Sequence, residues 1–328
     1  MIPFENLVFE LVSYAIALVI IWKLARDPNR FHLIAFFIAI LTTATIELFG
    51  VREGHGYYYG DFLLVISAVS PVVLDFFGTT GRDVPLVIAV DWAIIIFCLW
   101  RLGERLNLTW YWVPPLLAML AVILDFALDP IAASSRLINV LGDNCIESIR
   151  PGPAEGVGYW IWCIPATPNQ FWFGVPIQNF YGWFLVVVVF VYFLLIAQRR
   201  TFSSSTGAQL AALIGAMVAN DALFLLLLGR FLSIDLGIWG WTILGVLMLL
   251  GLIALVMAGK ERRRYDTDWW ALIATIAIVA VSVFLYLFYL IGSVSTALVI
   301  GVAASLLVSV LLTLWLLYGK RMLGHSVP

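Results

Sequence analysis

The sequence predicts an all-α polytopic membrane protein, a single helical domain over residues 1–328 with about nine transmembrane helices. Three observations predict this class: of the 328 residues, 63% are hydrophobic and only 12% are charged, and the mean hydropathy is +1.04. A soluble domain has about 25% charged residues, so this chain lacks the side chains that cover a water-facing surface. The composition excludes soluble enzymes and disordered proteins. The net charge of −2 offers no basic surface for nucleic acid.

Apolar runs of about 20 residues predict the individual helices, because the backbone polar groups of a lipid-embedded segment must bond within that segment. The first run has no positively charged residues before it, so we expect a retained span rather than a cleaved signal. The third run is the shortest and the most polar, since it contains two aspartates, two serines and a proline. The ten runs are Phe4–Leu24, Phe31–Phe49, Asp61–Phe77, Val84–Leu102, Tyr111–Leu128, Ile177–Gln198, Ala208–Phe231, Leu236–Ala258, Asp268–Ile291 and Ser295–Tyr318.

The distribution of Lys and Arg bears on whether the third run, Asp61–Phe77, crosses the membrane. If it crosses, the eighteen basic residues divide eleven to seven between the two faces. If it dips in and returns, thirteen lie on one face and five on the other, as the positive-inside rule favours. We therefore expect nine spans plus one re-entrant or short segment, with eight or ten spans as alternatives. The chain then lies in a prokaryotic plasma membrane with its N-terminus outside and its C-terminus in the cytoplasm.

Residues 129–176 form the longest stretch without an apolar run. A loop of this length is usually functional or disordered, and its six aromatic residues are too apolar for a solvated, disordered chain. We expect a structured extracytoplasmic lid that packs on the mouth of the helical bundle. Cys145 and Cys163 lie in this loop and are able to pair in an oxidising compartment, whereas Cys98 is expected to be buried and reduced.

Carboxyl groups at membrane depth are the first candidates for function, because each costs about 2.5–3.5 kcal/mol to insert. Asp125 and Asp129 are four residues apart and therefore share one face of a helix, which we expect to end before Pro130. Two carboxyls this close disfavour joint ionisation, so one of them is able to stay protonated near neutral pH and to donate a proton. The structural alternative for Asp129 is that it merely starts a turn before Pro130.

Three further acids lie in or beside apolar runs, and each also has a structural interpretation. Glu47 ends the second run, where it is able to bond to a neighbouring helix as a carboxylic acid. Asp75 follows Pro71 by one turn and is able to satisfy backbone donors that the proline disturbs. Asp221 lies in the middle of its run, where solvation explains it least. Asp91, near the start of its run, is expected at the membrane interface.

Two clusters of aromatic residues exceed what an interfacial belt explains. Flat aromatic surfaces suit a long conjugated or polyprenyl chain, and their faces stabilise a developing cation. We therefore expect an elongated hydrophobic substrate, an acyclic carotenoid or another long isoprenoid, in addition to membrane lipid. One cluster is Tyr57, Tyr58 and Tyr59, and the other is Trp160, Trp162, Trp172 and Trp183.

Five motifs between Glu47 and Trp183 carry a resemblance to a known family. In order, they are Glu-Leu-Phe-Gly-Val-Arg-Glu-Gly at 47–54 with Tyr57–Tyr59, Asp125-x-x-x-Asp129-Pro130, Trp160-x-Trp162, Phe173-Gly174-Val175-Pro176, and Asn179-Phe180-x-Gly182-Trp183. On these motifs the chain resembles the integral-membrane carotenoid biosynthesis proteins, whose characterised members are carotenoid 1,2-hydratases of the bisanhydrobacterioruberin hydratase type. Its second half resembles them only in being apolar helices. The loop over residues 139–157 is longer than the family pattern leads us to expect.

The resemblance implies addition of water to the terminal 1,2 double bond of an acyclic carotenoid end, by a carbon–oxygen lyase without a redox cofactor or a metal. Such hydration needs an acid to protonate the alkene, an aromatic or carboxylate environment for the tertiary cation, and a positioned water. The expected catalytic residues are Asp125, Asp129 and Glu47, with Asn179 to orient the water. The expected substrate-binding residues are Tyr57, Tyr58, Tyr59, Trp160, Trp162, Phe173, Trp183, Asp75 and Asp221.

Three other functions remain alternatives to hydration. Asp125-x-x-x-Asp129 has a spacing able to hold magnesium on a diphosphate, which favours a membrane prenyltransferase or isoprenoid cyclase. However, the sequence has no second aspartate-rich motif, and the lid lacks the cluster of Lys and Arg that a diphosphate needs. A non-catalytic carotenoid- or lipid-binding protein uses the carboxyls only for helix packing. A transporter uses Glu47 and Asp221 as proton relays.

Overall fold

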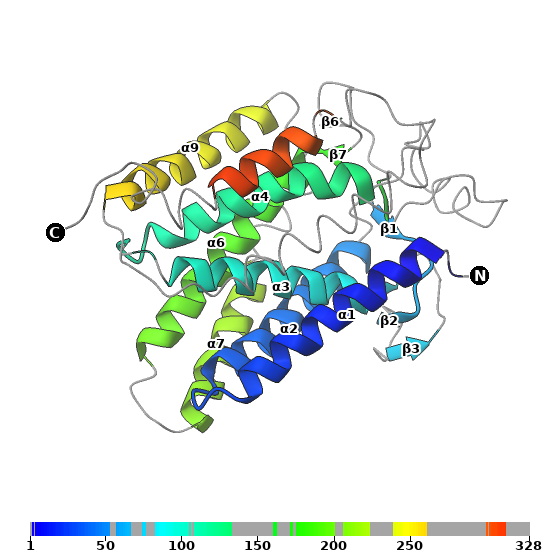
Figure 1. Cartoon of the computed structure of the whole chain (residues 1–328), viewed down its shortest axis with the longest axis horizontal. Helices are drawn as coiled ribbons and strands as arrows, with labels where there is room; N and C mark the ends of the chain where they lie inside the picture. The colour runs from blue at the N-terminus through cyan, green and yellow to red at the C-terminus, as the bar shows by residue number, and fades with distance from the viewer. Residues whose placement is uncertain are drawn as a thin grey trace.

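The structure is a computed structural model that describes residues 2, 4–52, 57–66, 74–76, 83–104, 106, 108–132, 160–162, 171–172, 175–200, 206–223, 239–260, 300 and 302–312. The architecture of this part is all-α, with short strands at one end of the helical bundle (Figure 1). The long helices are α1 (Phe4–Ala25), α2 (Phe31–Arg52), α3 (Leu86–Gly103), α4 (Val113–Ala132), α6 (Ile177–Arg200), α7 (Thr206–Leu223) and α9 (Trp239–Lys260). A shorter apolar helix covers Val302–Leu312.

Six helices in the described ranges are long and apolar enough to cross a membrane, namely α1, α2, α3, α4, α6 and α9. The predicted class, a polytopic helical membrane protein, agrees with this finding. The run Ala208–Phe231 is helical from Thr206 to Leu223, and Ser295–Tyr318 is helical over Val302–Leu312. The run Asp268–Ile291 lies outside the described residues, so the total of nine spans stays a prediction.

Helix α3 lies at the centre of the bundle. It packs against α1 and α2 on one side and against α4 and α6 on the other (Figure 1). Fifteen of its eighteen residues are buried, because its sequence is apolar all round and every face meets another helix. Helix α9 packs against α4 and α6, and its outer face exposes apolar side chains such as Val246 and Leu249. This exposed apolar face suits contact with lipid.

The segment Asp61–Phe77 forms strands in its described residues, which corrects the helical interpretation. Strand β2 (Leu64–Ile66) pairs antiparallel with β3 (Leu74–Phe76) and with β4 (Val84–Pro85). Glu10 of α1 accepts the backbone N–H groups of Leu63 and Leu64, at 2.6 and 3.2 Å, and so fixes the start of β2. The described strands of this segment thus lie in one sheet with β4, which leads into α3. That the segment does not cross the membrane stays a prediction.

Two further pairs of strands lie at the same end of the bundle. Strand β1 (Tyr57–Tyr59) pairs antiparallel with β5 (Trp160–Trp162), so that Tyr57 lies opposite Trp162 and Tyr59 opposite Trp160. Strand β6 (Phe171–Trp172) pairs with β7 (Val175–Pro176), which leads directly into α6. The first pairing brings the cluster Tyr57–Tyr59 next to Trp160 and Trp162 of the second aromatic cluster.

The helix that carries Asp125 and Asp129 does not end before Pro130, contrary to expectation. Helix α4 continues through Pro130 to Ala132. Because proline has no N–H, the carbonyl of Phe126, four residues earlier, loses its helical donor. The indole N–H of Trp172 donates to this carbonyl at 3.1 Å. A side chain from β6 therefore supplies the bond that allows the last turn of α4 to form.

Candidate functional site

Asp125 and Asp129 lie side by side on α4 and share a partner, Asn179 of α6. Asn179 Nδ2 donates to Asp125 Oδ2 at 2.8 Å and also to Asp129 Oδ2. The two carboxyls share this amide, and two carboxyls this close disfavour joint ionisation. Asp125 is fully buried and Asp129 is 2% exposed. The trio is therefore a buried pair of carboxyls that one amide holds together.

Glu47, near the C-terminal end of α2, accepts three hydrogen bonds. The hydroxyl groups of Tyr57 and Tyr59 donate to Oε2, at 2.7 and 2.6 Å. The indole N–H of Trp92 on α3 donates to Oε1 at 2.9 Å. Glu47 is buried, and burial opposes a charge at this position. The three donors reduce that cost in part, because an ionised carboxylate uses its lone pairs only as acceptors.

The two tyrosines stay donors across neutral pH. Burial, together with the negative charge of Glu47, raises the pKa of Tyr57 and of Tyr59 well above the usual value for a phenol. Their rings meet edge to face with centroids 5.7 Å apart, and Tyr59 meets Trp160 of β5 in the same way at 6.2 Å. The strand pair β1–β5 thus holds both phenols against Glu47 from outside the helical bundle.

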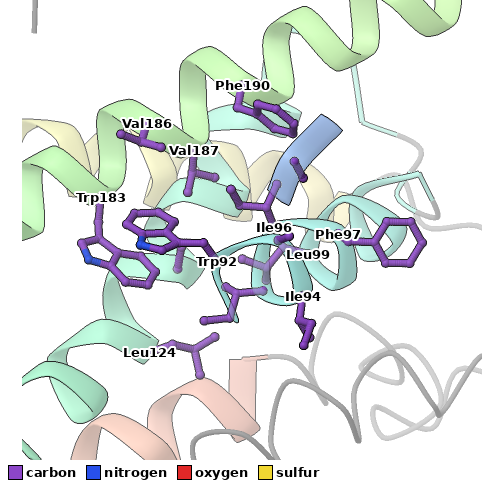
Figure 2. Packing of buried hydrophobic residues seen from close by; sticks show 14 of the residues in the cluster. Trp92, Ile94, Ile96, Phe97, Leu99, Leu124, Trp183, Val186, Val187 and Phe190 are labelled. Atoms are coloured by element: carbon purple, nitrogen blue, oxygen red, sulfur yellow. The ribbon is translucent and has the colours of Figure 1, made fainter. Parts of the chain in front are cut away.

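Trp92 and Trp183 connect the surroundings of Glu47 to those of the aspartates. Their rings stack with centroids 3.7 Å apart and planes 20° apart, and Figure 2 shows them facing each other between α3 and α6. Trp183 lies four residues after Asn179 and so on the same face of α6. These residues therefore form one cluster.

We call this group the acid cluster. Helices α2, α3, α4 and α6 and strand β1 each contribute to it, so it depends on the packing of segments more than 100 residues apart in sequence. Within the described part of the chain, no group of three or more His, Cys, Asp or Glu side chains is arranged to hold a metal ion. The acid cluster consists of Glu47, Tyr57, Tyr59, Trp92, Asp125, Asp129, Asn179 and Trp183.

Other predicted site residues lie outside the acid cluster. Asp221 is half-buried on α7 and accepts a hydrogen bond from Thr45 Oγ1 at 3.0 Å. Thr45 lies two residues before Glu47 and therefore on nearly the opposite face of α2. Trp160 is buried against Tyr59. Asp91, expected at the membrane interface, is instead enclosed by helices, with 5% exposure and Ser13 of α1 beside it.

Several predicted residues have side chains about which the structure gives no description. Tyr58, Asp75 and Trp162 lie in β1, β3 and β5 respectively, and only their backbones are described. Phe173, Cys145 and Cys163 lie outside the described residues, as does most of the predicted lid. Cys98 is buried in α3, as expected.

Sequence reasoning missed Trp92, which donates to Glu47 from the centre of the bundle. A tryptophan inside an apolar run is usually assigned to the membrane interface. Trp92 lies within an apolar run that has no polar face, so its indole is expected to be buried. A buried indole N–H needs an acceptor, and this is the signal that points to Trp92. No sequence pattern identifies Glu47 as that acceptor, since the two residues are 45 positions apart.

The fold and the site define a polytopic helical membrane protein with a cluster of buried acids at one end of its bundle. Residues 151–252 match the family model described as carotenoid biosynthesis protein. The match confirms the resemblance seen in the motifs from Trp160 to Trp183. It also extends to residue 252, into the half where the sequence had shown only apolar helices. No curated protein and no solved structure matches the chain.

Proposed function

We propose that the protein adds water to the terminal 1,2 double bond of an acyclic carotenoid, as a carbon–oxygen lyase that needs no cofactor. The observation that carries this proposal is the buried pair Asp125 and Asp129, whose carboxyls share Asn179 as a donor. Two carboxyls this close favour retention of one proton near neutral pH. Protonation of an isolated alkene needs an acid shielded from water, and the pair is buried. The match to carotenoid biosynthesis proteins supports a polyene as the substrate.

The reaction proceeds in two steps with the aspartate pair as the proton carrier. In the first step the pair transfers its proton to the less substituted alkene carbon, so that a C–H bond forms, the π bond breaks and a tertiary cation remains. In the second step a water oxygen bonds to the cation, and the proton lost by that water returns to the pair. The product is a tertiary alcohol and the pair is restored. Because the two carboxyls are coupled, their titration belongs to both, and the donor role is assigned to the pair.

The remaining residues of the acid cluster serve the cation and the water. Glu47, held by three donors, supplies a fixed negative charge, and such preorganised charge stabilises a cation without reorganisation during the reaction. The faces of nearby indole and phenol rings add a favourable contact with the cation. Asn179 uses Nδ2 for the two aspartates, which leaves its amide oxygen to accept a hydrogen bond from the attacking water.

Prenyl transfer fits the acid cluster less well. A diphosphate is held by Lys, Arg or metal ions, whereas the cluster consists of acids, an amide, phenols and indoles. Carboxylates repel a diphosphate when no metal ion or basic side chain lies between the two. A polyene is neutral when it binds and becomes a cation during hydration. The negative charges of the cluster then attract it.

Expression in a lycopene-producing host tests the proposal. We expect the extracted pigments to contain lycopene derivatives that have gained one or two molecules of water, as measured by mass spectrometry. A prenylated product that depends on magnesium contradicts hydration and favours prenyl transfer. Lycopene that co-purifies unchanged with the protein contradicts catalysis and favours a pigment-binding role. A host with an empty vector controls for hydration by other enzymes.

A further inference from the structure

We propose that Trp92 is a positioning residue that fixes the Glu47 carboxylate relative to the Asp125–Asp129 pair, an inference that rests on the proposed hydration. Trp92 Nε1 donates to Glu47 Oε1 at 2.9 Å, and its ring stacks on Trp183 at 3.7 Å. Trp92 is 8% exposed and Trp183 is 6% exposed, so the stack is enclosed by the bundle (Figure 2).

The three donors to Glu47 come from different kinds of structure. Tyr57 and Tyr59 lie on β1, a three-residue strand, and both donate to Oε2. Trp92 lies on the buried helix α3 and donates to Oε1. The terminal torsion of a glutamate is soft, so a carboxylate held at one oxygen is free to turn about that contact. The bond from Trp92 to the second oxygen removes this freedom and ties the carboxylate to the core.

The stack on Trp183 extends this constraint to the aspartates. Trp183 and Asn179 occupy the same face of α6 one turn apart, and Asn179 donates to both Asp125 and Asp129. Side-chain contacts therefore run from Glu47 through Trp92 and Trp183 to the helix that holds the proton-carrying pair. Hydration requires the proton donor and the negative charge to act on one double bond, and a misplacement of about 1 Å costs about 100-fold in rate.

Trp92→Phe tests the role of the hydrogen bond. Phenylalanine keeps a ring able to stack on Trp183 but lacks the N–H, so we expect kcat for hydration to fall about 10- to 100-fold while KM changes by less than about twofold. Trp100→Phe is the matched control on the same helix. Trp100 is fully buried, and its indole nitrogen has no hydrogen-bond partner among the described residues. A Trp92→Phe variant with the kcat of the wild type overturns the proposal.

Ultraviolet resonance Raman spectra of the indole groups give a readout that does not depend on activity. A carboxylate is a stronger acceptor than an amide, so the difference between wild type and Glu47→Gln should show one indole N–H with a weakened hydrogen bond. An unchanged indole spectrum overturns the proposal. If the wild type makes no hydrated product, the proposed function fails, and this spectrum alone decides whether Trp92 holds Glu47. If the Trp92→Phe variant does not accumulate in the membrane, the comparison of wild type with Glu47→Gln still shows whether Trp92 donates to Glu47.

Discussion

The indole N–H of Trp172 donates to the backbone carbonyl of Phe126, the acceptor that Pro130 leaves without its helical donor. The two rings are also in contact, with centroids 5.3 Å apart. Trp172 belongs to the strand pair β6–β7, which leads into α6, whereas Phe126 directly follows Asp125 on α4. This single bond therefore attaches the segment before α6 to the turn of α4 that carries the aspartate pair.

Replacing Trp172 by phenylalanine should destabilise the end of α4. The phenyl ring keeps the contact with Phe126 but leaves the partly buried carbonyl without this donor, which costs about 1 kcal/mol. We expect a lower thermal midpoint for the detergent-solubilised protein. Pro130→Ala supplies a backbone N–H to the same carbonyl, so Trp172→Phe should cost less in a Pro130→Ala background. Purely additive effects of the two substitutions would contradict the link between them.

A second stability prediction concerns the crossing of α4 and α9. A Cβ added to Gly251 would meet the Cβ of Met119 and would lie 2.9 Å from the carbonyl oxygen of Pro115. Neither atom lies at the end of a flexible side chain, so the two helices would have to separate. Gly251→Ala should destabilise the protein by about 1–3 kcal/mol. Gly245→Ala is the control on the same helix, because nothing lies within 4 Å of its added Cβ; equal thermal midpoints for the two variants would refute the close approach.

The opposite end of the bundle contains a polar contact between three helices. Glu104 follows α3 and accepts hydrogen bonds from His32 of α2 at 3.3 Å and from Gln198 of α6 at 2.7 Å. Arg101 pairs with its other carboxyl oxygen. Burial raises the pKa of Glu104, but the hydrogen bond to His32 and the charge of Arg101 outweigh burial and lower that pKa below its usual value of 4.5.

Acid should therefore weaken this contact. Because the pKa is lower in the folded than in the unfolded protein, the stabilisation is present above about pH 4.5 and is lost as the pH falls through the folded value. Glu104→Gln cannot titrate, so its thermal midpoint should fall less steeply than that of the wild type below about pH 4.5. The measurement is a series of melting curves in detergent over the acidic range. Parallel curves for the two proteins would rule out the contribution of Glu104.

The composition of the chain predicted the helical bundle, and the spacing of Asp125 and Asp129 predicted that they form a pair. Long apolar runs have few alternatives in lipid, and a spacing of four residues places Asp125 and Asp129 on one face wherever their helix packs. The failures have tertiary causes. The helix was predicted to end before Pro130 because no residue nearby in sequence donates to the carbonyl of Phe126 in place of the missing proline N–H. Trp172, 46 positions after Phe126, makes that hydrogen bond.

Sequence patterns also did not predict the contacts between segments, because these contacts join residues that are far apart in sequence. The register that places Tyr59 opposite Trp160 joins strands about 100 residues apart, and nothing in either strand specifies the other. The segment Asp61–Phe77 was apolar enough to resemble a short helix, but Glu10 of α1 fixes the start of a strand there. Trp92 became a candidate only when the packing of α2 on α3 brought its N–H to Glu47.

The nine-span topology makes a prediction of its own, motivated by the division of thirteen against five basic residues. Reporter fusions after Arg200 and after Arg264 should be cytoplasmic, and a fusion within Gly152–Gly158 should be extracytoplasmic. Alkaline phosphatase is active outside the cytoplasm, and green fluorescent protein fluoresces inside it. Fusing both reporters at each site gives every result a control of opposite sign. Finding Arg200 and Gly156 on the same face would contradict the nine-span arrangement.

The sharpest test of the proposed chemistry is the replacement of the aspartate pair. Asp125→Asn and Asp129→Asn each keep the volume and the hydrogen-bonding capacity of the side chain while removing its acidity. A general acid contributes about 10²- to 10⁴-fold to rate, so either change should leave hydrated product nearly undetectable by mass spectrometry while unmodified acyclic carotenoid accumulates. Glu47→Gln should also lower the yield, because it removes the negative charge that faces the cation.

Asp221→Asn is the matched acid-to-amide control for the pair. Asp221 accepts a hydrogen bond from Thr45 on nearly the opposite face of α2 from Glu47. An amide oxygen is able to accept the same bond, so turnover should persist in this variant. If both Asp125→Asn and Asp129→Asn retained full yield while Glu47→Gln or Asp221→Asn abolished it, the proton donor would lie outside the pair. The proposal of hydration would then remain, with a different residue as the proton donor. Mass spectrometry of the wild-type product tests the reaction, whereas the variants test which residue donates the proton.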